Sequence, residues 1–478
     1  MPLKVYNSLS GKLEEFIPLK KGKVGIYVCG PTVYDWTHLG HARTYTAFDT
    51  IIRWLKRKGF SVTYIQNITD VGHLREDTGE DKIGKKSAEE KVHPMVLVEK
   101  YMREYFRDMD RLDVIRPDIS PRATGHIIDM IEAVKKLIEK GFAYEVDGNV
   151  FFDISKFKEY GKLSKINPEE MTAGTRFEVH PDKRNPQDFA LWKKAKEGDP
   201  FKWPSPWGEG FPGWHIECSV MATKYLGDQI DIHGGGRDLK FPHHENEIAQ
   251  AETVTGKKPF VKYWLHTEFL TINGEKMAKS VGNYVTLRQA LEKYDAETLR
   301  FFFASTHYRS PMDYSEKNLE QARRSLESLR NSVILLKKLK EAKAKDEGEL
   351  EKEMKKTAEE FDKAMDDDFN TSGALAALFE FSRKLNTFAS NNESISAELK
   401  GRILKMFDEF GGILGLKLTE EKRAGGELLE RVLQILIKAR EELRKKGDWK
   451  ASDEIRAELR KGRIILDDEK EGTSWKFE

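Results

Sequence analysis

Cysteine is scarce in this sequence, which places only two, Cys29 and Cys218, among 478 residues. Two thiols cannot build a disulfide scaffold, and such sparse use is typical of the reducing cytoplasm. The sequence also lacks any apolar run long enough to span a bilayer. Lys4, Lys12 and Glu14 interrupt its beginning, which is not the pattern of a signal peptide. We therefore expect a cytoplasmic protein without a membrane segment.

An excess of charge of one sign is missing as well, because 81 lysines and arginines nearly cancel 80 aspartates and glutamates. The net charge of +1 neither indicates nor excludes a nucleic-acid partner, which would need a local basic surface. No internal repeat with a period of about 20–50 residues is visible. A chain of 478 residues is too long for one compact core, so we expect about two to four domains.

The first part of the chain has the pattern of a βαβ unit. Residues 23–29 and 62–65 are short apolar runs of the kind that form buried strands. Between them, apolar residues recur at helical spacing over 47–55, and Gly59 ends the pattern. This alternation predicts an α/β fold with a Rossmann-like, doubly wound parallel sheet.

The rest of the chain changes character several times. Residues 95–141 have a helical pattern, and we expect the sheet to resume at 213–221 and 229–233. From residue 319 onward amphipathic helical periodicity dominates, for instance over 326–336. The predicted domains are a Rossmann-like domain (1–117 and 203–255), a connective insertion (118–202), a domain with a lysine-containing loop (256–318), an α-helical bundle (319–416) and a small C-terminal domain (417–478).

The motif His38-Leu39-Gly40-His41 follows the first predicted strand and begins the helix. Gly40 lets a ligand approach the backbone, and the free N–H groups of a helix N-terminus attract phosphate. The two imidazoles could donate hydrogen bonds to phosphate oxygens as charge builds in a transition state. Histidines near a helix start are also common as caps or surface residues, and four residues alone do not decide between these interpretations.

A second motif, GEKMAKSVGN, spans residues 274–283 and places Lys276 and Lys279 three positions apart. Its glycine, serine and asparagine residues predict a mobile loop that presents ammonium groups to a polyanion. Taken alone, a solvated loop explains the stretch better. The two motifs together resemble the signature pair of the class I aminoacyl-tRNA synthetases, although that family has serine where this chain has Ala278.

Four other residues are of types that bind Zn²⁺: Cys29, Cys218, His243 and Glu247. His243 and Glu247 are four positions apart and therefore share one face of a helix. By type, His244 is an equally suitable ligand. Because the candidates are scattered and no Cys-x-x-Cys pair is present, spacing alone favours buried, inert thiols.

Longer stretches resemble the cysteinyl-tRNA synthetase family, namely "CGPTVYD", "GWHIECS", "DIHGGG", "FPHHENE" and the ending "GDWKASDEIRAEL" with "GTSW". The similarity runs through essentially the whole chain. It implies one zinc ion held by Cys29, Cys218, His243 and Glu247, with L-cysteine, ATP accompanied by Mg²⁺, and tRNA(Cys) as substrates. It also implies ligation of cysteine to the 3′ end of the tRNA, by a chain that we expect to be a monomer.

The resemblance assigns roles to further residues. Those that it implies in catalysis are His38, His41, Lys276 and Lys279, whose charges and hydrogen bonds would stabilise the triphosphate. Those implied in binding are Gly40, Gly234, Gly235, Gly236 and Lys279 for ATP, and Thr69, Trp214 and His233 for the amino acid. Without the resemblance, core packing explains Trp214 as well, and a tight turn explains the three consecutive glycines.

A zinc ion would solve a specific recognition problem, because cysteine and serine differ by one atom. A bound thiol loses its proton to zinc, whereas a serine hydroxyl is a poor ligand. The substrate thiolate would then join the zinc as an additional ligand and make an editing site unnecessary. Four protein ligands normally mark a closed structural site, so the zinc would have to expand its coordination or loosen one ligand.

The C-terminal module has a modestly basic composition. Residues 438–463 contain ten lysines or arginines and six acidic residues, which suits a phosphate backbone. An exposed Trp449 could stack on an unpaired base. By resemblance this is the anticodon-binding region, with Trp449 and Asp453 as candidate tRNA contacts; without it, an amphipathic helix with a packing tryptophan is the better interpretation.

Two other functions stay open at this point. An enzyme that shares the catalytic half could join cysteine to a small amine, although such an acceptor needs no anticodon-binding tail. A non-catalytic RNA-binding protein could also retain the fold.

Overall fold

The computed structural model describes residues 2–71, 82–166, 181–277, 282–420, 425–462, 464–469 and 472–477. The chain divides into two compact units, residues 1–418 and 419–478. Within the described ranges, no helix is both long enough and apolar enough to cross a membrane. The first unit contains every candidate catalytic and metal-binding residue that the structure describes.

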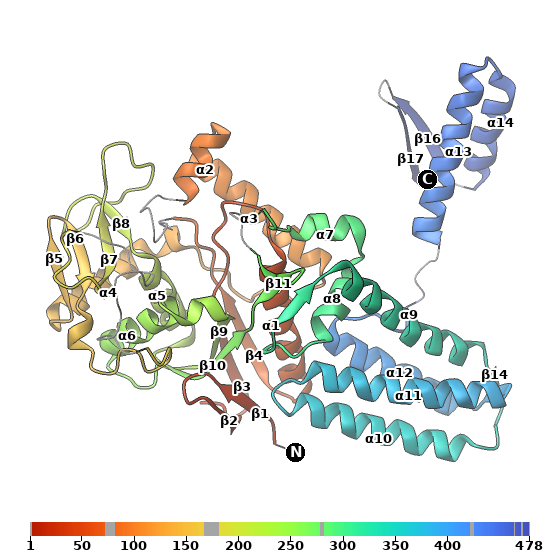
Figure 1. Cartoon of the computed structure of the whole chain (residues 1–478), viewed down its shortest axis with the longest axis horizontal. Helices are drawn as coiled ribbons and strands as arrows, with labels where there is room; N and C mark the ends of the chain where they lie inside the picture. The colour runs from red at the N-terminus through yellow and green to blue at the C-terminus, as the bar shows by residue number, and fades with distance from the viewer. Residues whose placement is uncertain are drawn as a thin grey trace. The chain divides into compact units, whose positions relative to one another are not determined.

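A four-stranded parallel sheet lies at the centre of the first unit (Figure 1). Its strands, in the order in which they pair, are β10 (Val261–Thr267), β9 (Ile230–Gly236), β3 (Lys23–Val28) and β4 (Ser61–Gln66). The chain runs from β3 to β4 on one side and later adds β9 on the other. The boundary between β3 and β9 is therefore a topological switch point, where doubly wound sheets bind ligands at the carboxyl ends of the strands. The predicted fold class is confirmed.

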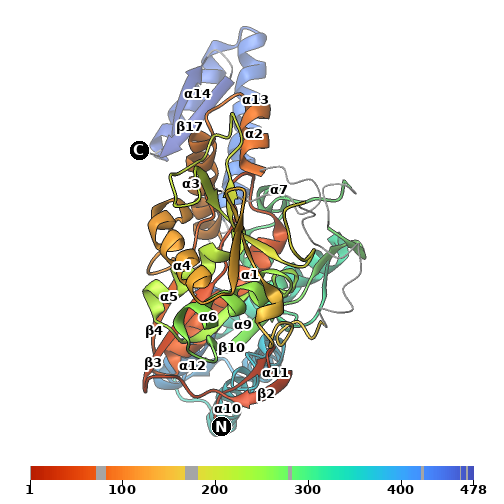
Figure 2. The ribbon, with the colours of Figure 1, turned by 90° about the vertical axis from the view of Figure 1, so that its left-hand side faces the viewer.

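Several helices pack around this sheet, and α4, α5 and α6 pack against one another (Figure 2). The helices of this part are α1 (Leu39–Arg57), α2 (Lys82–Glu90), α3 (Pro94–Arg111), α4 (Ile127–Glu139), α5 (Trp214–Leu226) and α6 (His243–Thr255), with the short 3-10 helices η1 (Ala123–His126) and η4 (Arg237–Lys240). The stretch 95–141, which reads as one helical pattern, contains α3, η1 and α4 with loops between them.

The strand predicted at residues 213–221 is wrong, because this stretch begins helix α5. Every residue from 216 to 222 is buried, and so is every residue from 243 to 253 in α6. A helix that is covered on all sides has no polar face, so its sequence lacks the periodicity that marks a helix.

Two predicted boundaries of the sheet domain differ from the structure. Strand β10 lies beyond residue 255, yet it completes the parallel sheet. The insertion forms an antiparallel sheet of its own, made of β5 (Ala143–Val146), β6 (Asn149–Phe152), β7 (Phe189–Lys194) and β8 (Gly210–Pro212), with η2 (Ile154–Lys156) after β6. Residues 118–122 instead run beside β4, where the backbone of Ile119 and Arg122 pairs with that edge.

The remaining elements of the first unit follow the sheet or precede it. An N-terminal hairpin consists of β1 (Lys4–Asn7) and β2 (Lys12–Glu15). A small sheet and two helices follow β10: β11 (Leu270–Ile272), β12 (Glu275–Lys276), β13 (Met312–Tyr314), α7 (Leu287–Lys293) and α8 (Ala296–Ala304). Next comes a helical bundle of α9 (Glu316–Lys338), α10 (Glu347–Met365), α11 (Thr371–Asn391) and α12 (Ala397–Leu414), with the short strands β14 (Lys340–Glu341) and β15 (Ser394–Ile395) (Figure 1).

The predicted apolar face of the first bundle helix is confirmed, because Leu326, Leu329, Val333 and Leu336 of α9 are all buried. The second unit contains α13 (Gly425–Lys445), α14 (Trp449–Lys461), β16 (Ile464–Glu469) and β17 (Gly472–Phe477), with the two strands paired antiparallel.

Candidate active site and metal centre

The first signature motif forms the N-terminus of α1. His38 is the N-cap, and its Nδ1 accepts a hydrogen bond from the backbone N–H of His41 at 3.3 Å. The proton of a neutral His38 therefore lies on Nε2, which can donate. The His41 ring stacks on His38 with 3.6 Å between ring centroids, and burial lowers the pKa of His41 to about 4. His41 can thus act as a neutral hydrogen-bond donor, and His38 Nε2 as a second donor, at a helix end that attracts anions.

The second signature motif and the residues directly after it lie beside the first motif, although more than two hundred residues of sequence separate them. The backbone N–H of Leu39 donates to Val285 O at 3.2 Å, and that of Leu287 donates to Thr37 O at 2.8 Å. The methyl group of Met277 lies 3.5 Å from the position that a Cβ on Gly40 would occupy. The structure therefore brings the two motifs together at the start of α1.

Of the two signature lysines, Lys276 is described by the structure, whereas Lys279 and the neighbouring Ala278 lie outside the described residues. Lys276 is the last residue of β12 and is exposed. Its Nζ lies 5.4 Å from the ring centroid of Phe269. An exposed ammonium group at the edge of the site is available to a polyanionic ligand.

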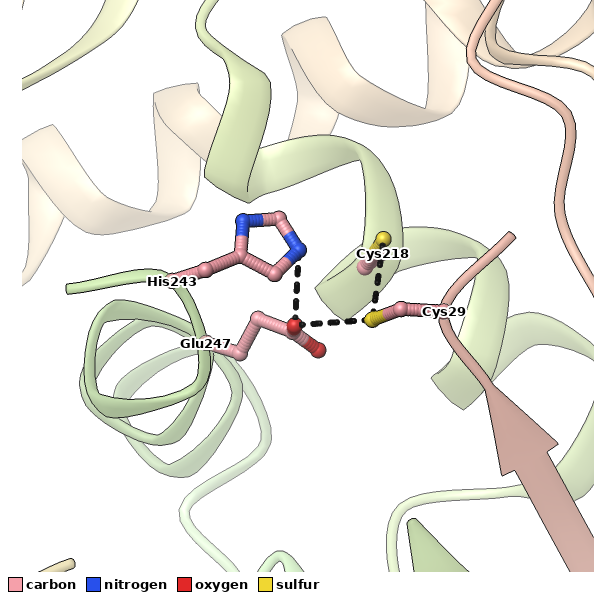
Figure 3. A group of neighbouring side chains, drawn as sticks. All are labelled: Cys29, Cys218, His243 and Glu247. Carbon is pink, nitrogen blue, oxygen red and sulfur yellow. Dashed lines mark hydrogen bonds and ion pairs between the residues drawn. The ribbon is translucent and has the colours of Figure 1, made fainter. Parts of the chain in front are cut away.

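The predicted metal ligands converge from three elements (Figure 3). Cys29 directly follows β3, Cys218 lies on α5, and His243 and Glu247 project from one face of α6. The Sγ atoms of Cys29 and Cys218 are 3.9 Å apart, Cys29 Sγ lies 3.6 Å from Glu247 Oε1, and that oxygen lies 3.0 Å from His243 Nε2. All four side chains are buried.

A second set of donors overlaps the first. Cys29 Sγ also lies 3.4 Å from His233 Nε2 and 3.3 Å from His244 Nε2. Cys29, His233, His244 and Glu247 therefore form another group whose ligand atoms all lie within 4.8 Å of one another. His233, expected in the amino-acid pocket, thus lies within the donor cluster, and His244 stays as plausible a ligand as its residue type indicated.

Two outer histidines that the sequence reasoning missed hold these rings. His215 Nδ1 lies 2.8 Å from His243 Nδ1, and His266 Nε2 lies 2.8 Å from His244 Nδ1. His266 in turn contacts the Ser8 hydroxyl at 2.8 Å. Metal-binding histidines are typically held in this way through their second ring nitrogen. In the sequence, His215 directly follows Trp214 within the motif GWHIECS. Its place in that motif was the signal that could have indicated a role at the site.

Protonation of the cluster shows how its charges are balanced. Burial opposes a charge on His243, but Glu247 and Cys218 beside it raise its pKa to about 10. Burial also opposes the Cys218 thiolate, yet a hydrogen bond from Cys29 and the neighbouring His243 lower its pKa to about 7. Burial raises the pKa of Cys29 and lowers that of His233 to about 4. A proton on His243 therefore balances the buried anions.

These observations fit a metal ion. Among the described residues, Glu247 Oε2 and His233 Nδ1 are buried without a hydrogen-bond partner. Buried anionic groups are costly unless a cation pairs with them, and a divalent ion would replace the proton that His243 carries. Two thiols, an imidazole and a carboxylate are the donors that Zn²⁺ accepts. The cluster can therefore hold a metal ion.

The other predicted pocket residues adjoin the cluster. The half-buried ring of Trp214 stacks on His243 with 4.2 Å between centroids. Thr69 is buried, and its hydroxyl donates to Glu217 Oε2 at 3.1 Å. Glu217, which directly precedes Cys218, is a buried carboxylate that the sequence reasoning did not single out.

The three glycines of β9 lie close to neighbouring groups of the chain, and at Gly234 this packing requires glycine. A Cβ at Gly234 would overlap the ring of Phe48 and lie 2.9 Å from Leu265 O. A Cβ at Gly235 would lie 2.8 Å from Leu239 Cδ1, and one at Gly236 would lie 2.5 Å from Asp238 Oδ1. The close approach of ATP to this backbone stays a prediction, whereas the close approach of neighbouring side chains is observed.

Replacing Gly234 by alanine is expected to lower the free energy of unfolding by about 1–3 kcal/mol, because a methyl group would be forced against a packed ring. Denaturation in urea measures the change. The matched control is Gly401→Ala on an exposed part of α12, where nothing lies within 4 Å of the new Cβ. That substitution is expected to raise stability by about 0.5–1 kcal/mol. Equal effects of the two substitutions would contradict the packing argument.

The predicted tRNA contacts lie in the second unit. Trp449 begins α14 and is 57 % exposed, so its ring is available for stacking. The guanidinium carbon of Arg444 lies 5.4 Å from the centre of that ring. Asp453 lies one turn later on the same helix and is exposed.

Solved structures share the fold at low sequence identity. Methionyl-tRNA synthetase of Mycobacterium tuberculosis in complex with methionyl-adenylate superimposes with a TM-score of 0.60 at 16 % identity, covering 87 % of this chain and 94 % of that one. Leucyl-tRNA synthetase of Agrobacterium radiobacter in a ternary complex gives a TM-score of 0.58 at 12 % identity, covering 84 % of this chain and 85 % of that one. The fold is therefore that of the class I aminoacyl-tRNA synthetases.

Family models and curated relatives show to which family within this class the chain belongs. A model described as "tRNA synthetases class I (C) catalytic domain" matches residues 15–324, a "DALR domain" matches 360–419, and a "Cysteinyl-tRNA ligase anticodon binding domain" matches 429–475. The cysteine–tRNA ligase of Thermococcus onnurineus is 48 % identical over 100 % of this chain and 99 % of its own, and that of Carboxydothermus hydrogenoformans is 47 % identical over 99 % and 100 %. The chain belongs to the cysteine–tRNA ligase family.

Proposed function

We propose that the chain activates L-cysteine with ATP and transfers the cysteinyl group to the 3′ end of tRNA(Cys). The observation that carries this proposal is the position of the buried donor cluster. Cys29 directly follows β3, and the helix that begins with His38-Leu39-Gly40-His41 lies nine residues further along the chain. Both lie at the switch point of the sheet, where a bound amino acid and a bound triphosphate would meet.

In the first step, a carboxylate oxygen of cysteine attacks the α-phosphorus of ATP, and the bond to the departing pyrophosphate breaks. His38 and His41 donate hydrogen bonds to the phosphate oxygens, while Lys276 and Lys279 neutralise the charge that develops on the leaving group. Mg²⁺ accompanies the ATP. No side chain acts as a nucleophile, so the protein contributes orientation and electrostatic stabilisation. In the second step, a 3′-terminal hydroxyl of the tRNA attacks the cysteinyl carbonyl and releases AMP.

Selection of cysteine depends on the donor cluster. We propose that Cys29, Cys218, His243 and Glu247 hold one Zn²⁺, with His233 and His244 beside them. When bound, this ion would accept the substrate thiolate as a ligand and would discriminate against the serine hydroxyl. Cys29 and Cys218 are both free thiols, as this role requires and as the proposed cytoplasmic location permits.

The direct test of this proposal is ATP–pyrophosphate exchange by the purified, zinc-loaded chain. Exchange should depend on cysteine and stay near background with serine. Transfer to purified tRNA(Cys) should then exceed transfer to small amines such as glucosamine. Exchange without transfer to tRNA would favour an enzyme that acts on a small acceptor, and the absence of exchange from zinc-loaded protein would favour a non-catalytic RNA-binding protein.

Replacing Trp449 by alanine tests the tRNA contact. If the ring stacks on a base, the KM for tRNA should rise by about tenfold to a hundredfold, which corresponds to the loss of one stacked base. Cysteine-dependent pyrophosphate exchange should not change. The matched control is Ile435→Ala, because Ile435 is an apolar residue of the same unit with 63 % exposure. A KM that changes by less than about twofold in both variants would exclude Trp449 as a contact.

A further inference from the structure

Glu217 is a buried carboxylate to which neither the metal cluster nor the signature motifs assign a role. Its side chain is 0 % exposed, and it lies on α5 directly before Cys218. Oε2 accepts a hydrogen bond from the Thr69 hydroxyl at 3.1 Å. Oε1 is buried and has no hydrogen-bond partner within the part of the chain that the structure describes. A buried carboxylate oxygen with an unused acceptor is costly and is best satisfied by a bound cation or donor.

A chain of hydrogen bonds fixes the direction in which this carboxylate is held. The backbone N–H of Gly30 donates to Asn67 Oδ1 at 2.8 Å, and Asn67 Nδ2 donates to Thr69 Oγ1 at 3.2 Å. Because the hydroxyl oxygen of Thr69 already accepts that bond, its own proton is directed to Glu217 Oε2. The hydrogen bond from Thr69 therefore occupies Oε2 of Glu217 and leaves Oε1 free. The chain of hydrogen bonds begins at Gly30, which directly follows Cys29.

The position of Glu217 on α5 matches the dimensions of the substrate. Trp214 lies three residues before Glu217, and Cys218 lies four residues after Trp214, so the three side chains share one side of the helix. In cysteine, the thiol and the ammonium group are separated by only two carbon atoms. A group that binds the ammonium must therefore lie beside the residues that position the thiol.

Outside the donor cluster, two other buried carboxylates near the site, those of Asp70 and Glu245, have their oxygens occupied. Asp70 accepts the backbone N–H of Thr124 at 2.9 Å and its hydroxyl at 2.6 Å. Glu245 accepts the backbone N–H groups of Gly161 and Ser164 at 3.0 and 2.6 Å. Glu217 differs from both because one of its oxygens has no such partner.

We infer that Glu217 Oε1 binds the α-ammonium group of the substrate cysteine, with Thr69 and Asn67 as the positioning residues that hold the carboxylate. This inference rests on the proposed function. The charge-assisted hydrogen bond gives affinity, and it selects an α-amino acid over a simple thiol, because a thiol without the ammonium leaves the buried carboxylate unpaired. Thr69, predicted to bind substrate directly, acts through Glu217.

The test compares two ligands in the zinc-loaded full chain and its Glu217→Gln variant. Cysteine and 3-mercaptopropionate carry the same thiol and carboxylate, but the second lacks the amino group. Calorimetry should show that Glu217→Gln weakens cysteine binding by about tenfold to a hundredfold. Binding of 3-mercaptopropionate should change by less than about twofold, and the zinc content should stay the same. Glutamine can still accept the hydrogen bond from Thr69, so the local structure is maintained.

Two further variants make the result decisive. Glu217→Asp keeps the charge and should retain part of the preference for cysteine, which also covers the case in which the glutamine variant does not fold. Glu252→Gln is the matched control, because Glu252 is buried but accepts from the backbone N–H of Phe260 at 3.1 Å and from Lys162 at 2.6 Å. That control should leave the ratio of the two affinities unchanged.

Equal losses for both ligands in Glu217→Gln would overturn the inference and leave the proposed function intact, since the wild-type chain would still prefer cysteine. A wild-type chain that binds neither ligand and supports no pyrophosphate exchange would overturn the proposed function itself, and the inference with it.

Discussion

Replacing Cys218 by serine is expected to reduce the zinc content from about one ion per chain to below about 0.1, because a hydroxyl is a poor ligand and the remaining donors include only one thiol. Cysteine-dependent pyrophosphate exchange should fall by about 10³-fold or more, since the thiol of the substrate then has no partner. Metal analysis and exchange assays on the same preparation measure both effects. The position of Cys218, 3.9 Å from Cys29 and buried beside His243, is the structural reason for expecting so large a loss.

The control must introduce the same hydroxyl without touching the cluster. Ala222→Ser does so, because Ala222 is a buried residue one helical turn after Cys218 on α5. It should keep a full equivalent of zinc and most of the exchange activity. If Cys218→Ser still holds stoichiometric zinc and still rejects serine as a substrate, this ligand set is wrong. The overlapping set around His233 and His244, which does not include Cys218, would then be the alternative.

The existence of a donor cluster that can hold a metal ion was predictable from residue types and resemblance, but its composition was not. The sequence reasoning selected four ligands and left His244 open, whereas the structure places His233 and His244 within 3.4 Å of Cys29 as well. His233 comes from β9 and His244 from α6, so the approach of both rings to one sulfur atom depends on how these elements come together in three dimensions. Such ångström-scale placement depends on tertiary contacts that no local pattern encodes.

Secondary structure was predictable where one face of a helix is exposed to solvent. Helix α9 keeps its apolar residues on one side, and the prediction was confirmed. Helix α5 is buried over residues 216–222, so it has no polar face, and the strand predicted there was wrong. The same burial makes α5 and α6 informative in another way. Burying glutamate and histidine side chains costs free energy unless these groups bind a partner or a ligand. The buried glutamates and histidines of α5 and α6 therefore indicate a functional site between the two helices.

The β9 glycines show how one residue type can suit two explanations. The family resemblance implies that Gly234 to Gly236 bind ATP, and glycine does permit the close approach of a ligand. In the structure, the nearest groups are Phe48, Leu239 and Asp238. Glycine is common in flexible loops and ligand sites and also in tightly packed strands. Composition alone therefore cannot separate ligand binding from internal packing.

Replacing Lys276 by alanine is expected to lower the rate of pyrophosphate exchange by about 10²–10³-fold, the usual cost of removing one group that stabilises transition-state charge. Lys276 is exposed, and its ring contact with Phe269 is weak, so neither stability nor zinc content should change. The KM for cysteine should also stay constant, because the ammonium group would act on the phosphates and not on the amino acid. Steady-state kinetics over a range of cysteine concentrations separates the maximal rate from the KM.

The matched control for this loss is Lys293→Ala, which removes an equally exposed lysine from the end of α7. It should leave the rate within about twofold of the wild type. Lys276→Arg keeps the charge on a bulkier group and should recover part of the rate. A loss of less than about fivefold in Lys276→Ala would assign the stabilisation of the leaving pyrophosphate to His38, His41 and Lys279 alone. A loss that appears in the KM for cysteine would instead mean that Lys276 positions the amino acid.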